Sequence, residues 1–319
     1  MSPGGYAVDP ELASVLTEMA QRTAGDPVAA RGDWRALREI VEANMRWLAE
    51  LERAGMPEVE LRDFETVTPD GARIALRWYA QPESTPGSAV LFAHGGGMIA
   101  GDLDVYDPMV SRYADATGMP FVSVQYRLAP EVSGTTPADD AFAGLRWLLA
   151  HASELGVDPS RIAVMGESAG GGIAAGVAIR AREARIELAR QVLIYPMLDD
   201  RNVTPDEARD GLLTWDHDMS FTCWSALLGD ARGTDAVSPV AAPARLTDFH
   251  GLAPAYVEVG DLDIFRDEAI AYAQRLAAAN VPVELHLHPG APHGYERYAP
   301  ESALARRAMY DRARVLRAI

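Results

Sequence analysis

One short stretch near the middle of the chain decides the fold class. It reads Arg161-Ile-Ala-Val-Met-Gly166-Glu167-Ser168-Ala169-Gly170-Gly171-Gly172. Its apolar start predicts a buried strand, and the small residues that follow predict a helix over residues 169–186. G-x-S-x-G occurs by chance in glycine-rich loops, but between a strand and a helix it marks a sharp turn that exposes the serine hydroxyl. Ser168 is therefore the predicted nucleophile.

Strands and helices are predicted to alternate on both sides of this turn. Apolar strands are expected at 89–93, 121–126, 161–165, 191–195, 255–259 and 283–287, and helices near 103–117, 138–154, 169–186, 264–279 and 301–318. Apolar strands separated by helices indicate a mostly parallel sheet that helices cover on both faces. Pro69-Asp70-Gly71 joins two further extended runs, which predicts an antiparallel hairpin at the sheet edge. The predicted fold class is α/β.

Two helical regions outside this alternation are expected to cover the sheet. Within residues 1–57, apolar positions repeat with helical spacing. The region at about 200–228 is polar and then aromatic, and no strand is predicted between it and residue 255. Amphipathic helices cannot bury their apolar faces alone. We therefore predict an N-terminal cap segment at 1–57 and a catalytic domain at 58–319, into which a second cap segment is inserted at about 200–228.

Composition excludes several classes of function. The 29 basic and 46 acidic residues leave a net charge of −17, which disfavours binding to nucleic acid or to anionic membranes. A single cysteine, Cys223, excludes an intrachain disulfide and a zinc site made of thiolates alone. No secretory signal is predicted at the N-terminus, and the apolar segment 173–179 is too short for a membrane helix. The expected location is cytoplasmic.

A second glycine-rich motif follows the strand predicted at 89–93. It reads His94-Gly95-Gly96-Gly97. Glycines leave backbone N–H groups unshielded, so these groups can point at an oxyanion that develops on a substrate. A phosphate loop is the alternative, but it would need Gly-Lys-Ser/Thr or G-x-G-x-x-G, and the chain has no lysine. Gly96 and Gly97, together with the N–H of Ala169, are the predicted oxyanion hole.

A serine hydroxyl is a weak nucleophile until a base removes its proton, and that base must be held by an acid. After a G-x-S-x-G turn, the chain order is serine, then the acid, then histidine. His293 follows the strand predicted at 283–287, so it is expected at the same edge of the sheet as Ser168. His293 is therefore the predicted base.

The other downstream histidines receive different interpretations. His217 lies between two aspartates and is interpreted as part of a solvated turn. His286 and His288 alternate on one strand beside Glu284, which could form a metal pair. No third ligand with a recognisable spacing accompanies them, so hydrogen-bonded strand histidines are the preferred interpretation and no metal site is predicted.

The acid is expected in the loop after the strand at 255–259. This loop reads Gly260-Asp261-Leu262-Asp263-Ile264-Phe265-Arg266-Asp267. The strand that precedes it is expected to neighbour the strand that leads to His293. Asp267 is expected on the first turn of the next helix, where a carboxylate serves the helix dipole. Asp263 is the preferred acid, and Asp261 is the alternative.

Taken together, these motifs resemble those of the hormone-sensitive-lipase-like branch, or family IV, of the α/β-hydrolases, the bacterial carboxylesterases. The pattern from about residue 60 onward is also similar to bacterial heroin-esterase-type enzymes. The motifs occur in the family's order, as His94-Gly-Gly-Gly97, Tyr126-Arg-Leu-Ala-Pro-Glu131, Gly166-Glu-Ser-Ala-Gly-Gly171, Asp263-Ile-Phe-Arg-Asp267 and His293-Gly294. Glu167 stands where aspartate is usual, Met98 where an aromatic residue is common, and Ile264 where proline is usual.

The resemblance implies a serine carboxylesterase that forms an acyl-enzyme and needs neither a metal nor an organic cofactor. The implied catalytic residues are Ser168, Asp263 and His293, with Gly96, Gly97 and Ala169 as the oxyanion hole. Tryptophan, methionine and leucine residues in the expected cap favour a small apolar pocket, and hence short- to medium-chain or aryl esters. The same triad serves acyltransferases and amidases, and some proteins of this fold are non-catalytic ligand receptors, so these are the alternatives.

Basic residues gather in the last predicted helix, at Arg306, Arg307, Arg312, Arg314 and Arg317. We interpret them as a solvated face that suits the negative end of the helix dipole. They could instead meet an acidic surface of a second subunit, because the family often dimerises near its last strand and helix. The expected partners are thus a small-molecule ester and a possible second copy of the chain.

Overall fold

One eight-stranded sheet forms the centre of the described part of the protein. The computed structural model describes residues 5–22, 25, 27–82, 87–202, 205, 208–209 and 211–319. The strands are β1 (Glu60–Val67), β2 (Arg73–Ala80), β3 (Gly87–Ala93), β4 (Phe121–Val124), β5 (Val157–Glu167), β6 (Arg190–Ile194), β7 (Ala255–Gly260) and β8 (Val283–His288). They lie in the order β1-β2-β4-β3-β5-β6-β7-β8. β1 and β2 form the predicted antiparallel edge, and β3 to β8 run parallel to β4.

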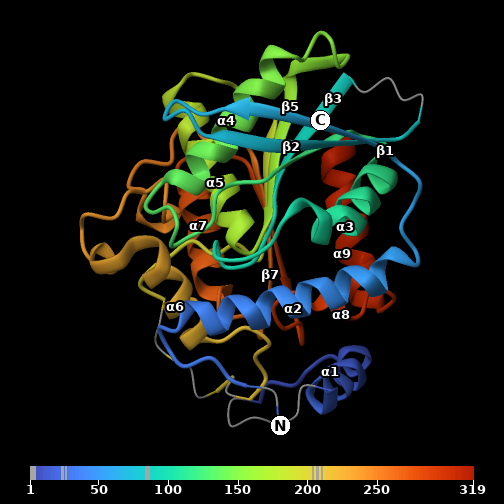
Figure 1. Ribbon diagram of the computed structural model, residues 1–319, viewed down its shortest axis with the longest axis vertical. Coiled ribbons are helices and arrows are strands. Elements are labelled where there is room, and N and C mark those ends of the chain that lie inside the picture. Colours follow the sequence, from blue (N-terminus) through green and yellow to red (C-terminus); the bar gives the residue numbers. More distant parts are fainter. Residues whose placement is uncertain are drawn as a thin grey trace.

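The helices lie on both faces of this sheet (Figure 1). One layer holds α3 (Leu103–Thr117) and α9 (Ala303–Arg317), and the other holds α4 (Thr136–Ala150), α5 (Ala169–Glu183) and α7 (Arg266–Ala278). All residues of β7 are buried, as expected for a strand covered on both faces. The predicted α/β class and the α/β-hydrolase arrangement are confirmed.

Among the strand boundaries that differ from the sequence prediction, those of β5 and β4 have an identifiable cause or consequence. β5 begins at Val157 rather than at residue 161, because Val157 pairs with Gly87 before the register shifts to Ala89. β4 ends at Val124, and Tyr126 is already outside the sheet. The Tyr126 hydroxyl turns back and donates a hydrogen bond to the carbonyl of His94 (2.8 Å). The shorter strand therefore places a side chain that braces the glycine-rich loop after β3.

Three helices lie near the carboxyl ends of the strands: α1 (Pro10–Arg22), α2 (Trp34–Arg53) and α6 (His217–Leu228). α2 runs across the molecule in Figure 1 and contacts both α3 and α6. The amide of Gly32, just before α2, donates to Thr222 Oγ1 on α6 (2.8 Å). α1 packs against α8 (Tyr295–Tyr298) through Leu12. Parts of both predicted cap segments lie outside the described residues, so the domain boundaries stay predictions.

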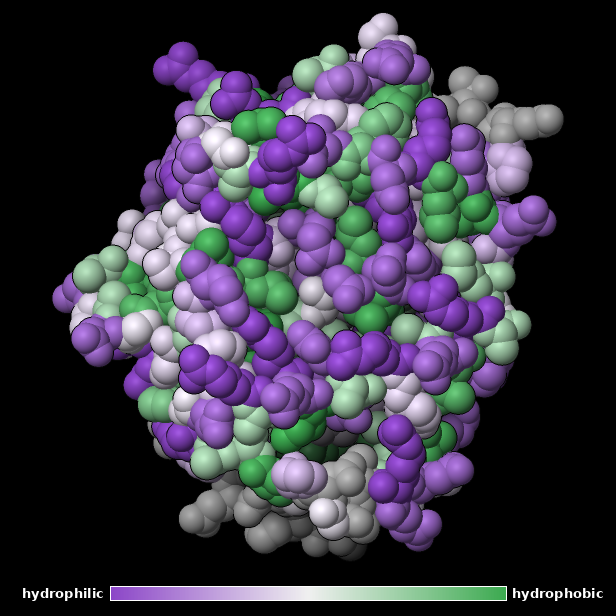
Figure 2. Space-filling model, in the orientation of Figure 1, coloured by the Kyte–Doolittle hydropathy of each residue, from purple (hydrophilic) through white to green (hydrophobic). Residues whose placement is uncertain are grey.

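The surface around α2 mixes hydrophilic and hydrophobic side chains. In Figure 2 a band of hydrophilic residues follows α2, and the surface below it is hollowed with hydrophobic residues at the rim. Two short 3₁₀ helices, Gly229–Ala231 and Pro243–Arg245, complete the elements. Among the helices of the described residues, none combines the length and the apolar character that crossing a bilayer requires.

Two expectations about solvated residues are wrong. His217 is not in a solvated turn: it is the first residue of α6 and is only 4% exposed. Arg312 is not on a solvated face of the last helix, because its exposed fraction is 0%. It lies four residues after Ala308 and four before Leu316, both buried, so it belongs to the apolar face of α9. A buried cation needs carboxylate partners, and the ones that Arg312 finds are described below.

Candidate active site

The serine of the G-x-S-x-G motif forms the turn between β5 and α5. Ser168 has φ 57° and ψ −120°, a backbone conformation that residues other than glycine rarely adopt. Gly166 and Gly170 pack so closely that a Cβ atom on Gly166 would overlap the backbone of Gly170. A Cβ atom on Gly170 would overlap the carbonyl of Ala93 at the end of β3. The two glycines thus make room for a turn that holds the serine in a strained position at the strand end.

The structure brings the three side chains of the predicted triad together. His293 Nε2 lies 2.9 Å from Ser168 Oγ, and His293 Nδ1 lies 2.6 Å from Asp263 Oδ2. The second oxygen of Asp263 accepts a hydrogen bond from the amide of Phe265 (2.9 Å), which fixes the carboxylate. When Nδ1–H donates to Asp263, the neutral imidazole has its free lone pair on Nε2, facing the serine hydroxyl. This arrangement can remove the hydroxyl proton.

The other two aspartates of the loop after β7 point elsewhere. Asp261 Oδ1 accepts a hydrogen bond from the amide of Gly290 (2.7 Å). Asp267 lies on the first turn of α7, as predicted, and pairs with Arg266 (2.7 Å). Of the three aspartates that the sequence leaves in competition, Asp263 is the one beside His293.

The glycine-rich loop after β3 lies beside the serine. Gly96 lines the same cavity as Ser168 and His293. Gly97 has φ +63°, and a Cβ atom there would overlap the buried Cys223 thiol. Ala169 is the first residue of α5, so its N–H is one of the amides that a helix leaves free at its start. Gly96 and Gly97 have no side chains and Ala169 directly follows Ser168, so the amides of these three residues are the candidates for an oxyanion hole.

The cavity at Ser168 is small and mostly apolar. Its volume is about 120 Å³, and its walls include Val41, Met45 and Leu48 of α2. A larger hollow of about 500 Å³ lies between α2, the segment before it and the start of α6. The two spaces share Ile40, Asn44 and Met219 in their walls. The two spaces thus adjoin each other.

A buried charge network lies beneath the serine. Tyr113 O–H donates to Glu167 Oε1 (2.7 Å), and Arg312 Nη1 donates to the Tyr113 oxygen (2.7 Å). Arg312 also pairs with Glu296 (2.8 Å) and with Glu258. Burial, reinforced by the charge of Glu296, raises the pKa of Glu167 to about 7. The sequence marks Glu167 only as a departure from the family pattern and gives no signal for Glu296.

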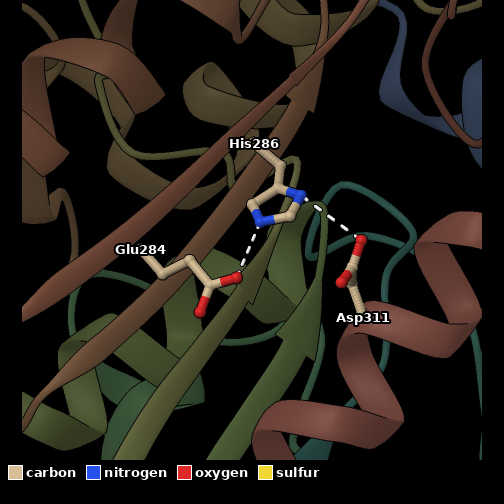
Figure 3. A group of neighbouring side chains, drawn as sticks. All are labelled: Glu284, His286 and Asp311. Carbon is tan, nitrogen blue, oxygen red and sulfur yellow. Dashed lines mark hydrogen bonds and ion pairs between the residues drawn. The ribbon is translucent and has the colours of Figure 1, made fainter.

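One group within the described part of the chain has the composition of a metal site (Figure 3). Ligand atoms of Glu284, His286 and Asp311 lie within 4.8 Å of one another. Asp311 comes from α9, which is why the spacing around β8 does not reveal it. However, the two imidazole nitrogens face different carboxylates, Nε2 toward Glu284 (2.7 Å) and Nδ1 toward Asp311 (3.6 Å), and Arg314 pairs with both acids. We therefore interpret this group as an ion-pair network that joins β8 to α9.

Sequence reasoning misses two residues that contact the triad. Arg209 Nη1 donates to the backbone carbonyl of Asp263 (2.5 Å). Thr214 Oγ1 donates to the backbone carbonyl of His293 (2.7 Å). Both come from the predicted second cap segment, far from their partners in the sequence. Hydrogen bonds to a distant backbone carbonyl leave no motif or spacing, so no sequence signal marks these residues.

Comparison with known proteins gives a consistent result. A family model described as the alpha/beta hydrolase fold matches residues 90–297. Esterase LipI of Mycobacterium tuberculosis is 36% identical over 301 residues, which cover 92% of this chain and 89% of LipI. Ethyl acetate hydrolase of Pseudomonas putida is 33% identical over 308 residues, which cover 91% of this chain and 92% of that enzyme.

Solved structures of esterases have the same fold. The structure described as bacterial heroin esterase superimposes with a TM-score of 0.86 at 36% identity, with 98% of each chain covered. A hyperthermophilic esterase from the archaeon Pyrobaculum calidifontis superimposes with a TM-score of 0.87 at 29% identity, again with 98% of each chain covered. The likeness therefore extends over nearly the whole chain.

Proposed function

The chain belongs to the hormone-sensitive-lipase-like α/β-hydrolases and is a carboxylic-ester hydrolase, and we propose that Ser168, His293 and Asp263 carry out its reaction. One observation carries this proposal: a continuous hydrogen-bonded chain leads from Asp263 Oδ2 through both nitrogens of His293 to Ser168 Oγ, with distances of 2.6 and 2.9 Å. This is the geometry that lets an imidazole act as a general base toward a hydroxyl.

The proposed reaction proceeds through an acyl-enzyme. Ser168 Oγ attacks the acyl carbon while His293 Nε2 takes the hydroxyl proton, and Asp263 stabilises the imidazolium that forms. The amides of Gly96, Gly97 and Ala169 donate to the oxyanion of the tetrahedral intermediate. The ester oxygen then leaves as an alcohol with the proton from His293. Water, deprotonated by the same nitrogen, attacks the acyl-enzyme and releases the acid.

We further propose short acyl chains as the preferred substrates. A cavity of about 120 Å³ has room for about four water-sized groups, since each takes about 30 Å³ of liquid volume. That suits acetyl to butyryl groups beside Ser168. The hollow of about 500 Å³ next to it would take the alcohol or aryl part of the ester. Small-molecule esters thus fit this site better than triglyceride emulsions.

We also propose that α2 and α6 act as the cap over the catalytic domain. Support comes from the cavity walls, which are formed by α2 on one side and by Trp215 and Met219 on the other. The cap segments would then decide which esters reach Ser168. A cytoplasmic location remains a prediction that cell fractionation can test.

A homodimer remains a proposal as well. Leu285 and Leu287 are 38% and 45% exposed on β8, the edge strand of the sheet. An edge strand with exposed apolar residues is suited to pairing with a second copy. Light scattering is expected to give twice the chain mass, and a monomer at micromolar concentration would contradict the proposal.

A panel of p-nitrophenyl esters from acetate to laurate, with matched anilides, tests the proposed function. We expect the highest kcat/KM on acetate to butyrate, a steep fall on longer chains, and no measurable anilide cleavage. A maximum on laurate or on triglyceride would contradict the acyl-chain proposal. Faster anilide cleavage than ester cleavage would favour an amidase, and preferential formation of a new ester in the presence of added alcohol would favour an acyltransferase.

A further inference from the structure

One short stretch of the chain contacts three of the four loops that carry the proposed catalytic groups, namely those after β3, β7 and β8. It comprises Arg209 and residues 211–215, directly before α6. Arg209 reaches the loop after β7, and Thr214 reaches the loop after β8. Trp215 packs against the glycine-rich loop after β3, where a Cβ atom on Gly97 would come within 3.3 Å of its ring. We call this stretch the strap.

Two polar contacts of the strap are made to the backbone of the acid and of the base themselves. Arg209 Nη1 donates to the carbonyl of Asp263 at 2.5 Å, and the side chains of both residues are buried. A hydrogen bond from a guanidinium in such an environment is among the stronger ones. Thr214 Oγ1 donates to the carbonyl of His293 at 2.7 Å. Each bond therefore fixes the peptide that carries a catalytic side chain.

The acid and base loops are also joined directly, by hydrogen bonds from Asp261 N–H to the His288 carbonyl (3.0 Å), from Leu262 N–H to the Ala291 carbonyl (3.2 Å) and from Gly290 N–H to Asp261 Oδ1 (2.7 Å). None of these three bonds involves the backbone of Asp263 or of His293. Asp263 lies between the end of β7 and the start of α7, and His293 between β8 and α8. Their distance from each other is decided by how the two loops lie. The strap contacts both loops at once, so it can hold them at the separation that keeps His293 within reach of Asp263 and Ser168.

We propose that Arg209 and Thr214 are positioning residues, which hold the acid and base loops in the aligned arrangement from the cap side. This inference rests on the proposed function. Trp215 also forms a wall of the cavity at Ser168, so the strap joins the substrate-binding surface to the loops behind it. A substrate that packs against this wall then stabilises the alignment of the triad.

The positions call for two pairs of variants. Thr214→Val removes the hydroxyl and keeps the shape, whereas Thr214→Ser keeps the hydroxyl. Arg209→Gln removes the guanidinium, and Arg209→Lys keeps the positive charge. As a matched control, Thr234→Val removes a threonine hydroxyl from the turn after α6, where it bonds to the Ala231 carbonyl and the Ala236 amide, away from both loops.

We expect Thr214→Val and Arg209→Gln to lower kcat on p-nitrophenyl acetate about ten- to a hundredfold, with KM changed less than about threefold, because small misplacements of catalytic groups lower the rate strongly. Thr214→Ser should restore most of kcat, and Thr234→Val should leave it within about twofold. The far-downfield proton signal of the His293–Asp263 hydrogen bond should broaden in Thr214→Val and persist in Thr214→Ser.

Wild-type kcat in both Thr214→Val and Arg209→Gln would overturn the proposal, as would a kcat loss in Thr214→Val that Thr214→Ser does not restore. If Arg209→Gln fails to fold, the Thr214 pair alone decides. Ser168→Ala, measured in parallel, distinguishes a failure of the strap proposal from a failure of the proposed function. Turnover that persists in Ser168→Ala contradicts the proposed function itself, whereas an inactive Ser168→Ala beside a fully active Thr214→Val contradicts the strap alone.

Discussion

His293 and His286 each lie against a carboxylate, yet their surroundings differ. His293 Nδ1 is 2.6 Å from Asp263, and His286 Nε2 is 2.7 Å from Glu284. The second nitrogen of His293 faces the hydroxyl of Ser168 (2.9 Å). The second nitrogen of His286 faces another acid, Asp311 (3.6 Å), in the group drawn in Figure 3.

The difference shows what a histidine–carboxylate pair needs in order to act as a base. An imidazole between an acid and a hydroxyl has a lone pair directed at a proton that it can remove. An imidazole between two acids, with Arg314 paired to both, is part of an ion-pair network instead. The His293 side chain is 10% exposed and that of Asp263 0%, against 25% for His286 and 34% for Glu284. Electrostatic interactions are stronger at the buried pair and screened at the exposed one.

The largest effect is expected when each imidazole is removed in turn, which tests whether the two histidine–carboxylate pairs differ in function. His293→Gln should lower kcat/KM on p-nitrophenyl acetate by about 10⁴-fold or more, since no base remains for Ser168. His286→Gln, the matched control, should stay within about twofold, because its network touches neither the cavity nor the serine. Comparable losses in the two variants would show that the two clusters do not differ in function.

The next largest effect should distinguish the acids in the loop after β7. Asp263→Asn should lower kcat by about 10⁴-fold, because an amide facing Nδ1 favours the wrong tautomer of His293. Asp261→Asn should lower it less than about threefold, since its carbonyl oxygen can still accept from the Gly290 amide. Steady-state kinetics on one ester is sufficient, and a larger loss in Asp261→Asn would assign the acid to Asp261.

Besides the base and the acid, the site at Ser168 has the backbone amides of the proposed oxyanion hole, which the His286 cluster lacks. Gly97→Ala should lower kcat by about 10²- to 10³-fold, because the new methyl group collides with Cys223 and displaces an oxyanion donor. Gly118→Ala is the control: it has a similar φ of +69° at the end of α3 but open space around it. Gly118→Ala should lower the stability by about 1 kcal/mol and leave kcat unchanged. Equal kcat losses in the two variants would contradict the role of Gly97.

The smallest expected effects are changes of folding stability with pH. They should have opposite signs for Glu167, next to Ser168, and for Glu284, which pairs with His286. Burial raises the pKa of Glu167 from 4.5 to about 7, so the folded chain holds this proton more tightly than the unfolded chain. Stability should therefore fall as the pH rises through this range. Glu167→Gln, followed by urea unfolding, should gain stability relative to the wild type between pH 5 and pH 8. A stability difference between Glu167→Gln and the wild type that stays the same from pH 5 to pH 8 would contradict the raised pKa of Glu167.

Glu284 should behave in the opposite way. Partial burial opposes its ionisation, but hydrogen bonds from Arg314 and His286 outweigh burial and lower the pKa of Glu284. The stability that the ionised Glu284 contributes is present above the ordinary carboxyl pKa and is lost as the pH falls through the lowered pKa. Glu284→Gln should thus be less stable than the wild type at pH 7, by less than about 1 kcal/mol, and equally stable in strong acid. A larger deficit in acid than at pH 7 would contradict this sign.

The parts of the site that could be predicted are those decided by local sequence. Gly166 and Gly170 are required by contacts within a few residues of Ser168 and by the neighbouring strand end, so a short motif carries the information. The sequence favours Asp263 as the acid but keeps Asp261 as an alternative, because the two are close in sequence and only the path of the loop decides which one faces His293.

The predictions that failed depend on distant partners. Two neighbouring aspartates suggest solvent around His217, but His217 is the first residue of α6 and is buried. Arg312 was expected in solvent because its partners Glu258 and Glu296 lie on other elements. Tertiary contacts of this kind leave no periodic or local pattern in the sequence. For the same reason, the sequence does not predict the contacts of the strap.

The most direct test of the central claim is to locate the nucleophile chemically. The protein is treated with a fluorophosphonate ester, and the modified peptide is identified by mass spectrometry in the wild type, Ser168→Ala and His293→Gln. The account predicts one adduct on Ser168 in the wild type, none in Ser168→Ala, and labelling slowed at least about a hundredfold in His293→Gln. An adduct on another residue, or equally fast labelling without His293, would contradict it, and a wild type that takes no label would favour a ligand receptor.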